Sequence, residues 1–203
     1  MPVKYLLLIL CSFMLLPRSR GQVLSFPDSV KKYDQSRLKI NRTGAYILGA
    51  WGIVNIAAGT IGYATEKQDE AKYFSGMNGI WGVLATGISI GGFVKTNAEI
   101  RHKRTYQQSY DQYLDDKKLY LVSGLVDLGL IAGGLGMSSY GSSAKGNGAV
   151  YSGFGKSIAL QGVFFLLFNN LMLAEHQSYS GRWYRLMDEL RVTNNGIGFS
   201  HSF

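Results

Sequence analysis

Long apolar stretches alternate with charged stretches along the chain. Four apolar segments are almost free of charged residues, and they cover residues 44–63, 73–94, 119–140 and 157–174. A helix rises ~1.5 Å per residue, so about 20 residues cover the ~30 Å hydrocarbon core of a bilayer. The apolar residues run continuously instead of alternating with polar ones, which disfavours the strands of a membrane β-barrel. The pattern therefore predicts four transmembrane helices.

The connections group these segments into two hairpins. Short polar loops, 64–72 and 141–150, join the members of each pair, whereas the middle connection, 95–118, is long and highly charged. We therefore expect an all-α integral membrane four-helix bundle, with a first hairpin over 44–94 and a second over 119–174. Buried helices of a soluble protein are the alternative, but such long uncharged stretches need a larger core than 203 residues can wrap.

Two short sequence motifs recur in the hairpins. Ile56-Ala57-Ala58-Gly59 matches Ile131-Ala132-Gly133-Gly134 at an offset of 75, and Ser75-Gly76 matches Ser152-Gly153 at an offset of 77. The matches suggest an internal repeat. It would be a parallel repeat, because two spans and a loop return the chain to its starting side.

Glycine is frequent in the apolar segments. In lipid, small residues four apart let helix backbones approach closely, and this packing drives helix association. We therefore expect six glycines to lie at helix–helix contacts: Gly59, Gly62, Gly87, Gly91, Gly129 and Gly133. The pattern leaves open whether these faces pack within the chain, on a second copy or on another membrane protein.

Polar residues inside the spans are the candidates for a functional site. Asp127 is the only acidic residue in a span, and Asn55, Asn169 and Asn170 lie at similar depths below the face that carries the middle connection. We expect the four to form one intramembrane polar cluster, with Asp127 hydrogen-bonded to Asn169 or Asn170 and Asn55 beneath them. An ionisable residue in a span is by default a functional-site hypothesis. The alternative is a neutral or amide-paired acid that fixes the register of the helices.

Other chemistry is not visible in the sequence. His102, His176 and His201 lie outside the spans with no carboxylate or cysteine at ligand spacing, and the one cysteine is Cys11. We therefore expect no catalytic residues, no cofactor and no metal site. The formal net charge is +8, but acidic residues are interleaved with the basic ones, so we expect no nucleic-acid partner.

Residues 1–21 have the pattern of a secretory signal peptide. Lys4 precedes the apolar run Tyr5–Leu16, and Pro17 and small residues follow. We expect cleavage between Gly21 and Gln22, with an uncleaved anchor as the alternative. We expect a protein of the cell inner membrane, and cleavage would place both termini of its mature chain in the periplasm. Fourteen Lys and Arg residues lie on the side of the linker and the tail, and four lie on the other side, so the positive-inside rule favours the reverse orientation. We keep the periplasmic placement because a signal peptide fixes the orientation of the chain early.

Three charged segments flank the spans: the N-terminal segment 22–43, the linker 95–118 and the tail 175–203. The linker and the tail each contain apolar residues at helical spacing, which are Tyr106, Tyr110, Tyr113 and Leu114 in the linker and Trp183, Leu186, Met187 and Leu190 in the tail. In the tail, Ser180 would cap such a helix and Asn194-Asn195-Gly196 would end it. We expect the linker and the tail to form amphipathic helices at the membrane surface, and 22–43 to be an interfacial segment.

Several motifs resemble those of a known family. They include Leu48-Gly49-Ala50-Trp51, Tyr73-Phe74, Asp127-Leu128-Gly129 and Gly153-Phe154-Gly155. The chain resembles, over about residues 37–203, an uncharacterised family of small bacterial membrane proteins, found mainly in Bacteroidota and described as a domain of unknown function. The resemblance implies an exported four-span architecture and no known activity.

The expected function is non-enzymatic. The glycine-rich faces favour a structural or interaction subunit, whose partners are the lipid bilayer and a membrane protein or a second copy of the chain. The alternative is a small transporter or an ion- or proton-conducting protein that uses Asp127.

Overall fold

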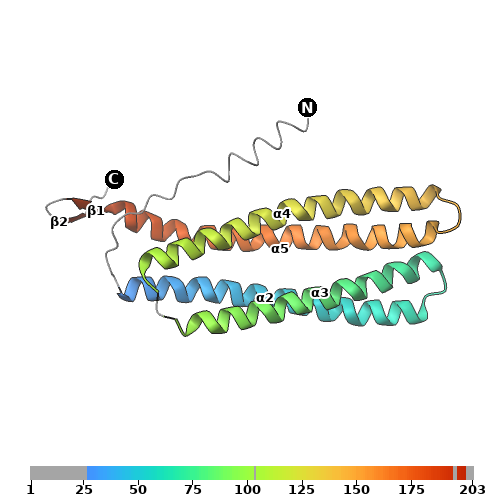
Figure 1. The fold of residues 1–203 in the computed structure, drawn as a ribbon, viewed down its shortest axis with the longest axis horizontal. Coiled ribbons are helices and arrows are strands. Elements are labelled where there is room, and N and C mark those ends of the chain that lie inside the picture. Colours follow the sequence, from blue (N-terminus) through green and yellow to red (C-terminus); the bar gives the residue numbers. More distant parts are fainter. Residues whose placement is uncertain (1–26, 103, 194–195, 200–203) are drawn as a thin grey trace, which may run out of the picture.

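Four long helices make up most of the structure. The computed structural model describes residues 27–102, 104–193 and 196–199 (Figure 1). The helices are α2 (Pro27–Thr65), α3 (Asp69–Ile100), α4 (Tyr106–Ser143) and α5 (Gly148–Glu189). Strands β1 (Leu190–Thr193) and β2 (Gly196–Phe199) follow and pair antiparallel, with Leu190 opposite Phe199. The predicted signal peptide and its cleavage site lie outside the described residues.

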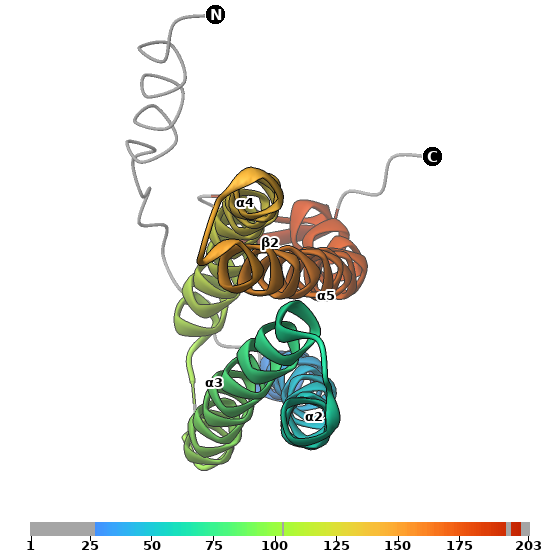
Figure 2. The same cartoon turned by 90° about the vertical axis from the view of Figure 1, so that its right-hand side faces the viewer.

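The helices are arranged as two hairpins, as predicted. α2 packs along α3, and α4 packs along α5 (Figures 1 and 2). Both short loops lie at one end of the bundle, which we call the loop end, and the end of α3 and the start of α4 lie at the opposite end, the linker end (Figure 1). The hairpins meet mainly through α3 and α5, with a smaller contact between α2 and α5. The all-α, four-helix prediction is thereby confirmed, whereas the small β-hairpin was not expected.

The helices are suited to a membrane by length and composition. Four segments are long and apolar enough to cross one, and they are Lys31–Thr65, Asp69–Ile100, Gln108–Ser143 and Gly148–Ser178. Large aliphatic side chains cover their outer faces, including Ile53, Ile61, Val94, Leu125 and Leu167, each more than half exposed. Soluble proteins rarely expose apolar surface on this scale.

The amphipathic patterns of the linker and the tail suggested surface helices, but within the described residues both segments are continuous with the long helices. The linker consists of the end of α3 and the first turns of α4, with residues 101–105 between them. Thr105 begins α4 with a capping box, in which its side chain accepts from the Gln108 backbone N–H at 3.3 Å. Ser180 does not cap a tail helix, because α5 runs through it to Glu189.

The contacts within the two hairpins are equivalent. A Cβ added to Gly82 of α3 would lie 2.6 Å from the carbonyl oxygen of Gly52 and 2.6 Å from the backbone nitrogen of Ile56. A Cβ added to Gly162 of α5 would lie 3.0 Å from the carbonyl oxygen of Asp127 and 2.9 Å from the backbone nitrogen of Ile131. Gly52 and Ile56 correspond to Asp127 and Ile131 at the predicted offset of 75, so the repeat includes the helix-packing geometry.

The second helices of the hairpins correspond at a different offset from the one predicted. Gly82 and Gly162 are 80 residues apart, whereas the motifs Ser75-Gly76 and Ser152-Gly153 had suggested an offset of 77. The difference of three residues is nearly one helical turn. The match between two-residue motifs of small residues therefore identified the correct face of the second helix, but it was displaced by about one helical turn.

Candidate functional site

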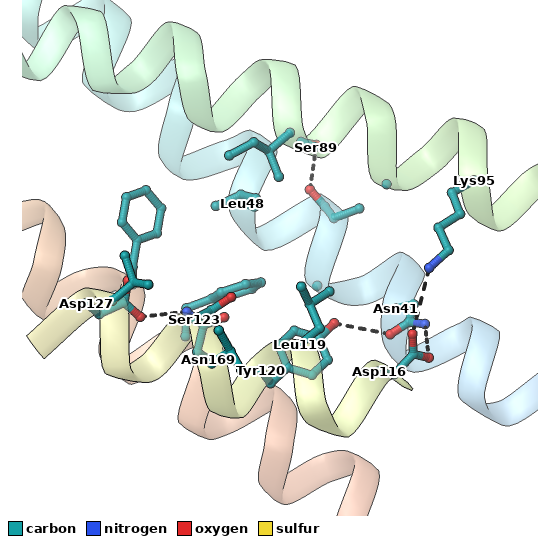
Figure 3. Close-up of a pocket in the computed structure, with 18 of the residues that line it drawn as sticks. Asn41, Leu48, Ser89, Lys95, Asp116, Leu119, Tyr120, Ser123, Asp127 and Asn169 are labelled. Carbon is teal, nitrogen blue, oxygen red and sulfur yellow. Dashed lines mark hydrogen bonds and ion pairs between the residues drawn. The ribbon is translucent and has the colours of Figure 1, made fainter. Parts of the chain in front are cut away.

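Asp127 pairs with Asn169, one of its two predicted partners. Asp127 lies on α4 and is 4% exposed, and Asn169 lies on α5 and is 8% exposed. The Asn169 side-chain amide donates to Asp127 Oδ2 at 2.6 Å (Figure 3). Asp127 forms no other hydrogen bond or ion pair within the described residues, so Oδ1 has no partner there. This pair joins the two helices of the second hairpin near the middle of the bundle.

The other two residues of the predicted cluster lie elsewhere. Asn170 is exposed, and its amide donates to the Leu166 carbonyl oxygen of its own helix at 2.7 Å. Consecutive helical residues point about 100° apart, so Asn169 and Asn170 do not both face the interior. Asn55 is buried, but it belongs to a different network. The prediction of one four-residue cluster is therefore wrong.

Asn55 belongs to an amide network in the half of the bundle nearer the loop end. Gln161 is fully buried at its centre, and its amide nitrogen donates to Asn55 Oδ1 and to Asn78 Oδ1, both at 2.8 Å. Gln161 Oε1 accepts from Trp51 Nε1 at 2.8 Å, and Ser157 Oγ donates to Asn78 Oδ1 at 2.8 Å. The network joins α2, α3 and α5. Each amide group in it makes at least one hydrogen bond, which lowers the free-energy cost of burying it.

A charged network at the linker end was not predicted as a site. Arg37 is 1% exposed, and its guanidinium donates to three carboxylates: Asp34 at 3.0 Å, Glu99 at 2.6 Å and Asp116 at 2.7 Å. Arg104 lies 3.3 Å from Asp34 and 3.2 Å from Glu99. We call the set Asp34, Arg37, Lys95, Glu99, Arg104 and Asp116 the Arg37 network. It contains three cations and three anions, so the charge of the network as a whole is balanced, although the Lys95 side chain is exposed.

Neutral polar groups connect the Arg37 network to the second hairpin. Asn41 of α2 donates to Asp116 Oδ2 at 2.9 Å, and Asn41 Oδ1 accepts from the Tyr120 hydroxyl at 3.2 Å (Figure 3). The His176 Nε2 of α5 lies 2.9 Å from the same oxygen. All four helices and the linker therefore contribute to one connected set of polar groups, which fixes the hairpins relative to each other at this end.

A crevice of about 570 Å³ lies between the hairpins in the half of the bundle nearer the linker end (Figure 3). Its floor is formed by buried side chains of α2, α4 and α5, which are Ala45, Leu48, Asp127 and Asn169. Its rims are formed by exposed aliphatic side chains of α3 and α4, which are Leu84, Ile88, Val122 and Val126. Because both rims are exposed and the floor is buried, the crevice opens sideways between α3 and α4.

Two of the six predicted packing glycines lie at contacts within the chain. A Cβ on Gly59 would lie 2.7 Å from the Ser75 carbonyl oxygen of α3, and one on Gly62 would lie 2.8 Å from Ser75 Cβ. For the other four, Gly87, Gly91, Gly129 and Gly133, nothing lies within 4 Å of the added Cβ. These four pack no helix of the described chain, and their role in packing stays a prediction for another chain.

Replacing Asp127 with asparagine is expected to keep the fold, with a change in the free energy of unfolding of about 1 kcal/mol or less. An amide oxygen at this position can accept the same hydrogen bond from Asn169. Asp127→Leu removes the acceptor and leaves a buried donor, so it should lose about 1–3 kcal/mol. Denaturant titration in detergent micelles compares the two variants. Equal losses would show that Asp127 is needed as a charge.

The fold and the site define a class: two parallel helical hairpins, each long and apolar enough to cross a membrane, joined by buried polar networks. The chain belongs to the DUF6992 family, a family of unknown function, whose model matches residues 47–170. The predicted resemblance to a domain of unknown function is thus confirmed, and an origin in Bacteroidota stays a prediction. No curated protein and no solved structure was found to match the chain. In the described part of the chain, no group of three or more His, Cys, Asp or Glu residues could hold a metal ion.

Proposed function

We propose that the protein is a non-enzymatic, four-span inner-membrane protein that acts as an interaction subunit for another transmembrane helix. The observation that carries the proposal is the set of open glycines on the outer faces of α3 and α4. Gly87 and Gly91 are four residues apart on α3, as are Gly129 and Gly133 on α4, so each pair shares one helix face.

Membrane placement is supported by the apolar outer faces and by the length of the helices. An exposed glycine contributes no apolar surface to lipid contact, and in a helix it costs about 1 kcal/mol relative to alanine. Pairs of small residues on a lipid-facing surface therefore suit the close approach of a second helix, which lipid chains alone do not require. A bilayer and a partner membrane helix are the partners that this surface fits.

A photoreactive amino acid placed at Gly133 is expected to give a discrete cross-linked product in membranes. The same amino acid at Ile61, which is 64% exposed on the outer face of α2, is the matched control and should contact lipid only. Denaturing electrophoresis and mass spectrometry measure the product. A cross-linked product with twice the mass of the chain would identify the partner as a second copy. A product of another mass would identify the partner as a different protein. Equal yields at Gly133 and Ile61 would contradict the proposal.

Transport through Asp127 is a second candidate, because its buried carboxylate lines the crevice instead of lying in a fully packed core. In this case purified protein in liposomes would carry a proton or cation flux, and Asp127→Asn would abolish it while the fold persists. Flux through the parent protein and not through Asp127→Asn would favour transport. No flux through the parent protein would leave the interaction role.

A further inference from the structure

We propose that the crevice between α3 and α4 binds a lipophilic alcohol, with its hydroxyl group at Asp127 and its hydrocarbon chain between the two helices. The inference rests on the membrane placement in the proposed function but does not depend on a partner helix. It concerns the inner side of α3 and α4, whereas the open glycines lie on their outer sides.

The floor of the crevice carries polar groups that are not fully paired. Asp127 uses Oδ2 to accept from Asn169, and its Oδ1 has no partner among the described residues. Ser123 lies one turn away on the same helix and also lines the crevice, and the three side chains lie close together in Figure 3. Its hydroxyl forms no hydrogen bond in the described part of the chain. Asp127 and Ser123 both line the crevice, so their unpaired oxygens are available to a ligand that occupies it.

The chemistry of these groups selects a hydroxyl group on the ligand. A hydroxyl can donate to Asp127 Oδ1 and accept from Ser123 Oγ at the same time, whereas an ether or a ketone only accepts. An ammonium group can donate to Asp127 Oδ1 but cannot accept from Ser123 Oγ. A single hydroxyl therefore fits the floor better than an ammonium or a carbonyl group.

The walls of the crevice select a hydrocarbon chain. Most of the lining outside the floor and the linker end is apolar, and it includes Leu84, Ile88, Val122, Val126, Phe165 and Phe168. Asp127 follows Asp116 by 11 residues on α4, so the lining extends ~16 Å along this helix. α3 packs on α5 and not along α4, which leaves a side opening toward the surrounding lipid. An acyl or isoprenoid chain can enter through this opening without crossing a polar surface.

The test uses a photoreactive probe on the purified full chain in detergent micelles. The probe is hexadecan-1-ol with a diazirine in its chain. Two unlabelled competitors of the probe are compared: hexadecan-1-ol, and its methyl ether, which has the same chain but cannot donate a hydrogen bond. We expect saturable labelling of α3 and α4 peptides, with the alcohol competing about tenfold better than the ether. In Asp127→Asn, whose amide can donate to either oxygen, this preference should shrink to about twofold or less.

Two tryptophan substitutions separate the crevice from general contact with lipid. Val122→Trp places a large ring on the crevice rim and should lower the labelling at least fivefold, whereas Ile61→Trp on the outer face of α2 should leave it unchanged. Unsaturable labelling, or labelling that Val122→Trp does not reduce, would show ordinary lipid contact and overturn the proposal. Equal competition by the methyl ether would overturn the hydroxyl assignment. The purified chain carries no partner, so this result and the cross-linking at Gly133 can fail independently.

Discussion

Replacing Arg37 with methionine is expected to lower the free energy of unfolding by about 3–5 kcal/mol. Arg37 is 1% exposed and donates to three carboxylates that come from α2, α3 and α4. Removing the guanidinium leaves these carboxylates close together, buried and without their main counter-ion. The loss comes mainly from this uncompensated charge, because the intact network itself gains little over an apolar core.

Arg42→Met is the matched control for Arg37→Met. Arg42 lies on the same helix, is exposed and takes part in no ion pair within the described residues, so its replacement should change the free energy of unfolding by about 0.5 kcal/mol or less. Arg37→Lys keeps the positive charge but loses the planar guanidinium group, which can donate to several carboxylates at once. We therefore expect an intermediate loss in the free energy of unfolding. Denaturant titration of the three variants in micelles measures the differences. An Arg37→Met variant as stable as Arg42→Met would show that the Arg37 network does not hold the hairpins together.

Replacing Gly134 with valine is expected to destabilise the second hairpin by about 1–3 kcal/mol or more, whereas Gly133→Val should be tolerated. A Cβ on Gly134 would lie 2.5 Å from the backbone nitrogen of Ala159 and 2.7 Å from the carbonyl oxygen of Gly155. These are backbone atoms, which cannot rotate away, so α4 and α5 must separate. Nothing lies within 4 Å of a Cβ on Gly133.

The two valine variants differ only in position, so they share any change in helix propensity. Thermal unfolding in mild detergent, followed by circular dichroism, compares them with the parent protein. Similar unfolding temperatures for Gly133→Val and Gly134→Val would contradict the packing of α4 on α5 described above.

The architecture could be predicted because continuous apolar runs and loop lengths are local properties of the sequence. The four helices and the two hairpins followed from them, and depth along the helices placed Asp127 beside Asn169 or Asn170 without choosing between the two. The face of each helix was harder to predict. Gly133 and Gly134 differ by about 100° around the helix axis, and the sequence alone did not show which of them faces α5.

The Arg37 network could not be predicted from local patterns. Its members are spread over positions 34 to 116, and each one has the appearance of an ordinary charge beside a span. Only the long-range packing of the hairpins makes Arg37 and Asp116 neighbours. The available signal was Arg37 itself, a charge on the helical face that continues inward along α2 to buried Ala45 and Leu48.

The central claim is that the two hairpins cross a membrane with the loop end and the linker end on opposite sides. Single cysteines at Gln108 and Gln177 mark the linker end and one at Ser143 marks the loop end, and all three positions are exposed. Cys11 is replaced by serine in each case. In bacterial spheroplasts, an impermeant thiol reagent should label Gln108→Cys and Gln177→Cys from the periplasmic side, and Ser143→Cys only after permeabilisation. Labelling of Ser143→Cys alone would keep the four spans but reverse the proposed orientation. Labelling of all three variants from the same side would contradict the four-span account.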